Sequence, residues 1–139
     1  MARSWTDKLN DDKDLPKVVK VAGKGRMAIA SPREVDGLMR RVAKGRVTTI
    51  NKLRAKIAKR HRADLACPIT TGIFAWIAAH AAEEARARGA ARITPWWRTL
   101  RGEGELNPKY PGGIARQRAL LRAEGHRFVT KGARVLVAT

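Results

Sequence analysis

Apolar residues recur at helical spacing in four segments of the chain, and the first of these begins at Ser31. In "SPREVDGLMRRV", Ser31 is an N-cap, Pro32 takes the first helical position and Glu34 completes a capping box. The predicted buried stripe consists of Val35, Leu38 and Met39. This segment is therefore predicted to be an amphipathic helix.

The second segment, "KGRVTTINKLRAKIAKRH", predicts a helix with two different faces. Gly45 interrupts the chain before it, and Thr48 or Thr49 supplies the N-cap. The apolar face holds Ile50, Leu53 and Ile57. The basic face holds Lys52, Arg54, Lys56, Lys59 and Arg60. We expect the apolar face to lie on a core and the basic face to lie in solvent.

The third segment, "CPITTGIFAWIAAHAAEEARARG", is largely apolar and predicts a buried helix. Thr70 or Thr71 is its expected N-cap and Gly89 its expected end. With the preceding helix and a turn over residues 63–68, it predicts a helix-turn-helix unit. Its first turn carries Thr70, Thr71 and Gly72 where a major-groove reader would carry Arg, Lys, Asn or Gln. A close, shape-driven approach to DNA is therefore favoured.

The fourth segment, "GIARQRALLRAEG", follows a loop rich in Gly, Pro and Asn and ends at Gly125. Its inward positions are Ile114, Leu120 and Leu121, and its outward positions include Arg116, Arg118 and Arg122. The tail, residues 126–139, alternates around Lys131 and Gly132. This alternation predicts a terminal β-hairpin that could serve as a wing.

Strand patterns also occur before the first helix. Residues 1–24 are predicted to be a mostly extended arm, with an edge strand over 15–21, and 26–30 is a second short strand. We therefore expect an N-terminal arm over residues 1–30 and one domain over residues 31–139. The predicted fold class is mainly α with small β elements, arranged as a winged helix-turn-helix.

Charge points to the partner. Lys and Arg total 30 against 12 acidic residues, a formal charge of +18 that repels itself strongly in 139 residues. Ten basic residues and no carboxylate lie between Arg40 and Arg62, which predicts a continuous positive surface. Phosphate contacts release condensed counterions, so we expect double-stranded DNA as the partner. RNA stays an open alternative, and an anionic membrane surface is a weaker one.

Several other functional classes are disfavoured. Cys67 is the single cysteine, which excludes an internal disulfide and a cysteine-based zinc site, so no cofactor or metal is expected. Glu83 and Glu84 resemble a solvated helix end paired with Arg86 and Arg88. No apolar run approaches a membrane span and no signal segment opens the chain. We expect a monomer in the cytoplasm, associated with the nucleoid.

Three motifs resemble a known family when they are taken in order. They are "KGRVTTINKLRAKIAK", "TPWWRTL" and "YPGGIARQRALLRAEGH". They are similar to the DNA-binding domain of the O6-alkylguanine-DNA alkyltransferases and their alkyltransferase-like relatives. In that family a basic segment opens the helix-turn-helix, "P-C-H-R-V" carries the methyl-accepting cysteine, and "Y-x-G-G" leads into a helix ending near "E-G". The resemblance covers about residues 32–126 and implies the fold of the family's C-terminal domain.

The resemblance places Trp96 on the nucleophilic cysteine of the family. Pro95 falls on the motif proline, Trp97 on the activating histidine and Arg98 on the arginine. Glu124 falls on the glutamate that orients the histidine, but here it has no catalytic group to orient. The alkyltransferase-like relatives also carry tryptophan at the cysteine position, recognise alkylated guanine without repairing it and hand it to excision repair. The resemblance therefore implies a protein that is not an enzyme.

Trp97, in place of the motif histidine, departs even from the alkyltransferase-like pattern, and two further positions depart from the family pattern. A tyrosine that helps to rotate the target nucleotide is replaced by Ile50, and an arginine that fills the space left in the duplex is replaced by Gly72. Unstacking a base costs free energy that neither replacement offsets.

The predicted lesion pocket consists of Trp96, Trp97, Arg98, Tyr110 and Glu124. Trp96 is expected to offer a stacking face to a flipped base, and core filling behind a closed pocket is the alternative. Trp97 is expected in the core. Tyr110 either borders the pocket or is an ordinary loop residue. Arg98 is expected to donate to nearby carbonyl groups.

The function predicted by these features is to probe duplex DNA for O6-alkylguanine and to flag it for excision-repair proteins. A general nucleic-acid-binding winged-helix protein is the alternative, and alkyl transfer through Cys67, ahead of a helix N-terminus, is a third hypothesis. The predicted DNA-binding residues are Arg46, Thr48, Thr49, Lys52, Lys56, Thr70, Thr71, Gly72, Gly112, Gly113 and Arg116.

Overall fold

The computed structural model describes residues 3–138, which form a mainly α structure with small sheets. The helices are α1 (Trp5–Leu9), α2 (Pro32–Arg40), α3 (Ile50–Arg60), α4 (Pro68–Ala87) and α5 (Gly113–Ala123). The strands are β1 (Lys17–Val21), β2 (Gly25–Ile29), β3 (Thr48–Thr49), β4 (Leu65–Ala66), β5 (Thr99–Leu100), β6 (Phe128–Lys131) and β7 (Arg134–Val137). Two 3-10 turns are η1 (Trp96–Arg98) and η2 (Gly102–Gly104). The predicted mainly α class with small β elements is confirmed.

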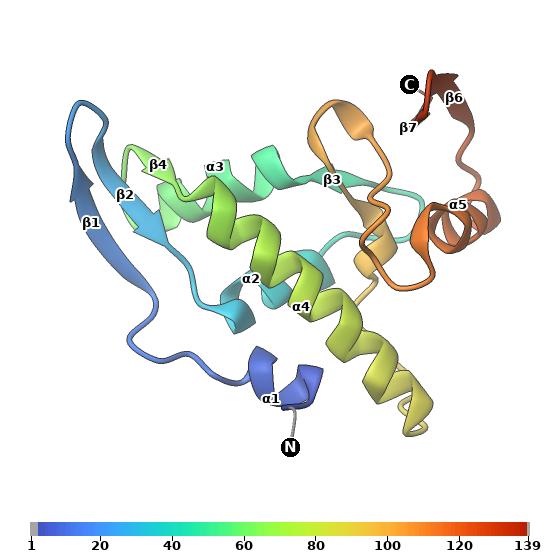
Figure 1. Cartoon of the computed structure of the whole chain (residues 1–139), viewed down its shortest axis with the longest axis horizontal. Helices are drawn as coiled ribbons and strands as arrows, with labels where there is room; N and C mark the ends of the chain where they lie inside the picture. The colour runs from blue at the N-terminus through green and yellow to red at the C-terminus, as the bar shows by residue number, and fades with distance from the viewer. Residues whose placement is uncertain (1–2, 139) are drawn as a thin grey trace.

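Helix α4 runs through the centre of the molecule, and α1, α2 and α3 pack against it (Figure 1). The largest core cluster lies among these helices and includes Val35, Met39, Leu53, Ile57, Ala75, Ala78 and Trp96. The predicted apolar faces of α2 and α3 are therefore confirmed. Ile50 is only partly buried at the edge of this core.

The first residues of the helices test the predicted N-caps. The Ser31 Oγ accepts a hydrogen bond from the Glu34 N–H at 3.1 Å, and the Thr49 Oγ1 accepts one from the Lys52 N–H at 3.2 Å, as predicted. The predicted threonine cap of α4 is wrong. Cys67 is the N-cap residue, and Pro68 begins the helix because its fixed φ suits the first helical position.

The strands form three small sheets. Strand β1 pairs antiparallel with β2, which pairs parallel with β4, and β6 pairs antiparallel with β7. These two hairpins lie at opposite ends of the long axis of the molecule (Figure 1). Strands β3 and β5 pair in parallel, which joins the start of α3 to the tryptophan motif. The predicted strands near 15–21 and 26–30 and the terminal hairpin are confirmed.

Residues Trp5–Leu9 form a helix, where a mostly extended arm was predicted over residues 1–24. Helix α1 begins after Ser4, whose Oγ accepts from the Asp7 N–H at 3.0 Å. The Trp5 ring stacks on His80 at a centroid distance of 4.4 Å and meets Trp76 edge-on at 4.7 Å. A helix this short has no apolar periodicity to read and depends on such tertiary contacts. The domain boundary at residues 30 and 31 stays a prediction.

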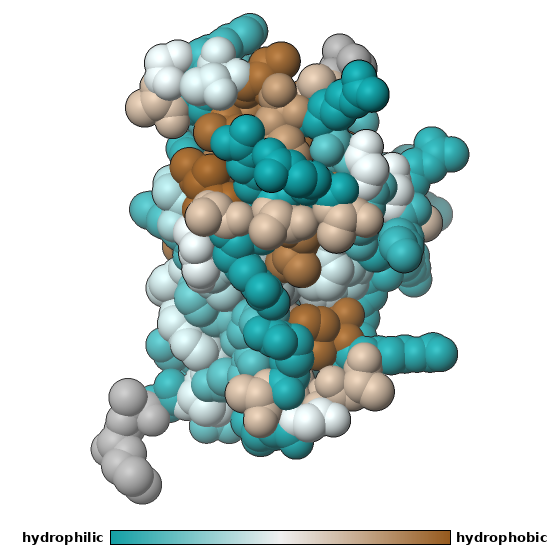
Figure 2. Space-filling view, turned by 90° about the vertical axis from the view of Figure 1, so that its right-hand side faces the viewer, coloured by the Kyte–Doolittle hydropathy of each residue, from teal (hydrophilic) through white to brown (hydrophobic). Residues whose placement is uncertain are grey.

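The face formed by α5 and the C-terminal hairpin is mostly hydrophilic, with apolar side chains in separate small groups (Figure 2). On α5, Leu121 is buried while Ile114 and Leu120 are partly buried, and Arg116 and Arg122 are exposed. Among residues 3–138, no helix is long and apolar enough to span a membrane.

Candidate DNA-binding site

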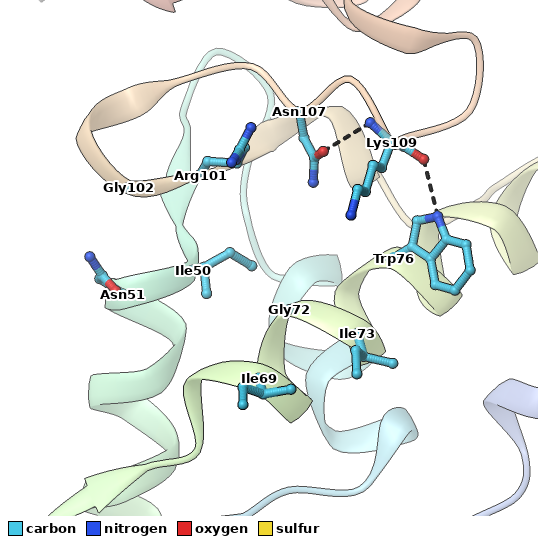
Figure 3. A pocket seen from close by; sticks show the side chains of 10 residues that line it. All are labelled: Ile50, Asn51, Ile69, Gly72, Ile73, Trp76, Arg101, Gly102, Asn107 and Lys109. Carbon is cyan, nitrogen blue, oxygen red and sulfur yellow. Dashed lines mark hydrogen bonds between the residues drawn. The ribbon is translucent and has the colours of Figure 1, made fainter.

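A cavity of about 520 Å³ opens between α3, α4 and the loop that follows the tryptophan motif (Figure 3). We call it the α3–α4 cavity. It is lined by Ile50, Asn51, Ile69, Gly72, Ile73, Trp76, Arg101, Gly102, Asn107 and Lys109. Its volume lies within the range of about 300–1,000 Å³ that small-molecule pockets occupy. The wall of the cavity includes Ile50 and Gly72, which stand in place of the family's tyrosine and arginine.

The apolar wall on α4 is open to solvent. The side chain of Ile69 is 70% exposed and that of Ile73 is 45% exposed. Both share one face of α4 with Gly72 and Trp76, which follow Ile69 by three and seven positions. Large apolar side chains that gather at an exposed concave surface are typical of binding sites.

Gly72 leaves the helix backbone uncovered in the middle of this wall. Its φ is not in the left-handed region, and an added Cβ would meet no atom within 4 Å, so the fold does not require glycine there. Glycine inside a helix costs about 1 kcal/mol relative to alanine. The absence of a side chain at this position lets a ligand approach the helix backbone closely.

The opposite wall of the cavity is a loop held by specific hydrogen bonds. The Trp76 Nε1 donates to the Lys109 carbonyl at 3.1 Å. The buried Gln117 side chain accepts from the Asn107 N–H at 2.8 Å and donates to the Trp97 carbonyl at 3.1 Å. Figure 3 shows the side chains of Asn107 and Lys109 directed from the loop toward α4. Within the described chain, this lining contains cations, amides and apolar groups but no thiol, imidazole or carboxylate.

A second hollow, of about 530 Å³, lies between the end of α2, the approach to β3 and α3. It is lined by Leu38, Arg41, Val42, Ala43, Arg46, Val47, Thr48, Lys52, Ala55 and Lys56. We call it the basic groove. It brings together four of the predicted DNA-binding residues, namely Arg46, Thr48, Lys52 and Lys56. Thr48 is buried in the parallel pair with β5, and the three cations are exposed.

The positive run is interrupted near its ends and intact in its middle. Arg40 Nε pairs with Asp36 at 3.0 Å, and Arg60 Nη1 pairs with Glu34 at 3.2 Å. Arg54 donates to the Ala66 carbonyl at 3.0 Å and so ties α3 to the turn before α4. Among the described residues, the cations of the run without a carboxylate partner include Arg41, Lys44, Arg46, Lys52, Lys56 and Lys59.

Trp96 lies in the core and not in the wall of the α3–α4 cavity. Its side chain is 0% exposed, and its Nε1 donates to the Glu83 carboxylate at 3.0 Å. Burial raises the pKa of Glu83, but hydrogen bonds from Arg86 and Trp96 bring it below its ordinary value. The rings of Trp97 and Tyr110 meet Trp96 edge-on at 5.6 and 5.5 Å. In this structure, therefore, Trp96 fills the core behind a closed pocket, which was the alternative to a stacking face.

Of the remaining predicted pocket residues, Trp97 and Tyr110 contact Trp96, and Arg98 lies over the Trp97 ring and pairs with Glu124. Arg98 Nη2 pairs with Glu124 Oε2 at 2.6 Å, and Arg98 Nη1 donates to the Val42 carbonyl at 2.8 Å, as predicted. Burial raises the pKa of Glu124, and the hydrogen bonds from Arg98 lower it below its ordinary value. Trp97 packs against both core clusters of the molecule, and Tyr110 is buried, which raises its pKa. These five residues are brought together, but away from the open cavity.

The threonines at the start of α4 are placed differently from the prediction. Thr71 is 2% exposed and its Oγ1 donates to the Cys67 carbonyl at 2.7 Å, so it offers no surface to DNA. Thr70 is partly buried. Burial raises the pKa of Cys67, whereas hydrogen bonds from Thr70 and the positive charge of Arg54 help to bring it below its ordinary value. Cys67 lines neither the α3–α4 cavity nor the basic groove.

The glycine turn before α5 has a conformational reason. Gly112 and Gly113 have φ values of 78° and 68°, which favour glycine. A Cβ at Gly112 would also lie 2.5 Å from the Cβ of Arg116. Arg116 is exposed at the start of the helix, and Thr49 is partly buried as the cap of α3.

The sequence patterns did not predict the loop wall of the cavity or the exposed isoleucines of α4. Asn107 and Lys109 lie in a segment whose Gly and Pro content predicts only an irregular loop. Ile69 was overlooked because the helix was predicted to begin at a threonine. With Pro68 as the first helical residue, Ile69, Ile73 and Trp76 form an apolar stripe separate from the buried one, and this signal could have been found.

The comparisons with known proteins found similarity to solved structures alone. No protein-family model matches the chain, and no curated protein matches it. A solved structure that it resembles is S. pombe Atl1 in complex with damaged DNA containing O6-carboxymethylguanine. The match covers 78% of this chain and 87% of that chain, with 15% identity and a TM-score of 0.49.

Proposed function

We propose that the protein binds duplex DNA without enzymatic activity and probes it for alkylated guanine. The observation that carries this proposal is the α3–α4 cavity, which opens beside the helix-turn-helix unit. Its apolar wall suits the flat face of a base. Its donors on Arg101, Asn107 and Lys109 suit the N7 acceptor that guanine keeps after alkylation, and its isoleucines suit the apolar alkyl group on O6.

The proposed absence of catalysis is supported by the residue that stands at the nucleophile position. Trp96 has no thiol, and its buried indole is hydrogen-bonded to Glu83. The cavity itself, whose lining lies wholly among the described residues, holds no nucleophilic cysteine or general base. Recognition in place of reaction is the role that these groups support.

The basic groove is the proposed phosphate-binding surface. Phosphate contacts position a protein on DNA, and base contacts specify the sequence or the lesion. Arg41, Arg46, Lys52 and Lys56 supply the positive charge. We further propose that the β6–β7 hairpin acts as a wing. The bound protein would then flag the lesion to excision-repair proteins in the cytoplasm, as a monomer associated with the nucleoid.

A titration at one fixed salt concentration tests this function. Two duplexes of the same sequence are compared, one with a single O6-methylguanine and one with guanine at that site. We expect about tenfold or greater preference for the modified duplex, because one matched set of base contacts contributes that much discrimination. Equal affinity for the two duplexes would show that lesion recognition is absent.

A general nucleic-acid-binding function is the second candidate, and one observation favours it. Trp96 and Tyr110, two of the three aromatic residues that the family resemblance assigns to the lesion pocket, are 0% and 3% exposed. They offer no stacking surface unless the core opens. This candidate predicts equal affinity in the same titration, together with a steep dependence of affinity on salt.

A further inference from the structure

We propose that Ile69, supported by Ile73, is an apolar wedge that enters the base stack of bound DNA. The proposal rests on the proposed DNA-binding function and adds the residue that opens the duplex. Ile69 and Ile73 rim the α3–α4 cavity on the first two turns of α4. A wedge at this rim would take the place of a base while the base enters the cavity beside it.

Helix α4 has a second apolar stripe that the protein covers only in part. The stripe consists of Ile69, Ile73 and Trp76, and His80 follows it on the same face of the helix. Its far end is covered, because Trp5 stacks on His80 at 4.4 Å and meets Trp76 edge-on at 4.7 Å. The near end is uncovered, since Ile69 is 70% and Ile73 is 45% exposed. A helix that is apolar on both stripes is normally buried, so a partner is expected on the open end.

The surroundings of the open end favour nucleic acid as that partner. The cavity shared with Ile69 and Ile73 contributes Arg101 and Lys109 and no carboxylate among the described residues. The acidic residues of the nearby loop are already paired, because Glu103 and Glu105 contact Arg134 at 2.7 and 2.9 Å. DNA combines a negative backbone with apolar base faces, which matches an apolar tip set among cations.

The position of Ile69 is fixed well enough for a wedge. Pro68 begins α4, and the Cys67 N–H donates to the Ala28 carbonyl at 2.9 Å, which ties the helix start to β2. Arg54 holds the preceding turn through the Ala66 carbonyl at 3.0 Å. Because the start of α4 is anchored, the Ile69 side chain can separate two stacked nucleobases without being displaced itself. Isoleucine is among the residues that proteins insert between base steps.

The experiment uses the full chain and a duplex with one central 2-aminopurine, which fluoresces when it is unstacked. Saturating wild-type protein is expected to raise this fluorescence. Ile69→Ser should abolish most of the rise and weaken binding about tenfold, because unstacking is then uncompensated. Ile69→Leu should retain both. The slope of affinity against salt should be equal in all three proteins, since the phosphate contacts are unchanged.

Val21→Ser is the matched control, because Val21 lies on β1, lines neither the α3–α4 cavity nor the basic groove, and is not part of the proposed wing. Circular dichroism checks that each variant is folded. Saturated wild-type protein without a fluorescence rise, or an Ile69→Ser variant that behaves like the wild type, overturns the wedge and indicates a protein partner for the stripe. The 2-aminopurine duplex contains no alkylguanine. Failure of lesion preference therefore leaves this result intact, and failure of the wedge leaves the lesion titration intact.

Discussion

The α3–α4 cavity and the basic groove are nearly equal in volume, about 520 and 530 Å³, yet their linings differ in chemistry. The cavity presents isoleucines, a tryptophan and two amides beside two cations. The groove presents four cations around small apolar side chains. This difference in lining supports different proposed roles, in which the groove binds phosphates and the cavity receives a base.

Helix α3 connects the two hollows. Ile50 and Asn51 line the cavity, and Lys52 and Lys56 line the groove. Because these residues lie on one short helix, phosphate contacts in the groove fix where the cavity meets the duplex. Variants in the shared core, in one hollow or in the other should therefore give separable effects.

Trp96→Ala is expected to have the largest effect and to damage both hollows together. Trp96 is 0% exposed and lines neither of them, so its removal leaves a void in the core that they share. We expect the free energy of unfolding to fall by about 3–5 kcal/mol. Urea unfolding monitored by circular dichroism measures it. A change well below this range, with selective loss of lesion preference, would restore the pocket-lining interpretation of Trp96.

Removing charge from the groove is expected to weaken all DNA binding without changing lesion preference. In the triple variant Arg46→Ala, Lys52→Ala and Lys56→Ala, the slope of log affinity against log salt should fall by about 2–3, and affinity by about 10- to 100-fold at moderate salt. Fluorescence anisotropy at several salt concentrations measures both.

The matched control for the groove removes the same charge elsewhere. Lys20, Lys24 and Arg92 are exposed and line neither hollow, so their replacement by alanine should leave the salt slope nearly unchanged. Equal effects from the two triple variants would mean that binding depends on total charge and not on the groove.

Gly72→Leu is expected to act on the cavity alone. A Cβ at position 72 meets no atom within 4 Å, so a leucine side chain can extend from the helix into the cavity. Preference for the O6-methylguanine duplex should fall to about one, while the salt slope is retained. Gly37→Leu on α2 is the control, because Gly37 has the same open surroundings and lines neither hollow. A Gly72→Leu protein that keeps its preference would exclude this cavity as the lesion pocket.

Local signals in the sequence predicted much of the fold. The caps at Ser31 and Thr49, the break at Gly45 and the terminal hairpin each depend on a few neighbouring residues, and the structure contains them. The positive groove could also be predicted, because unpaired charge along one helix stays at the surface. Arg46, Lys52 and Lys56 share one groove for this reason.

The candidate base site could not be predicted in the same way. Whether Trp96 faces a cavity or a core depends on Glu83 and Tyr110, which come from two other segments of the chain. Likewise, the exposure of Ile69 depends on how far α1 extends along α4, which no local pattern encodes. The resemblance predicted the position of the motif but not the closure of the space around it.

Lowering the pH is expected to have the smallest effect on stability, through the Glu124–Arg98 ion pair beside the basic groove. Glu124 holds Arg98, and Arg98 donates to the carbonyl of Val42 in the groove lining. The pKa of Glu124 lies below its ordinary value of 4.5 in the folded protein, so the charged form is the one that the fold stabilises. This stabilisation is present above the ordinary pKa and is lost as the pH falls through the lowered value.

Glu124→Gln isolates this contribution from the other carboxylates that titrate in the same range. At neutral pH the variant should unfold with a free energy about 1–2 kcal/mol below that of the wild type, because a charged acceptor is lost. The difference should shrink as the pH falls below 4.5, since the wild-type carboxylate then becomes neutral as well. Urea unfolding of both proteins across this range measures it. A difference that stays constant with pH would mean that the ion pair is not what anchors the groove, and that packing around Arg98 fixes it instead.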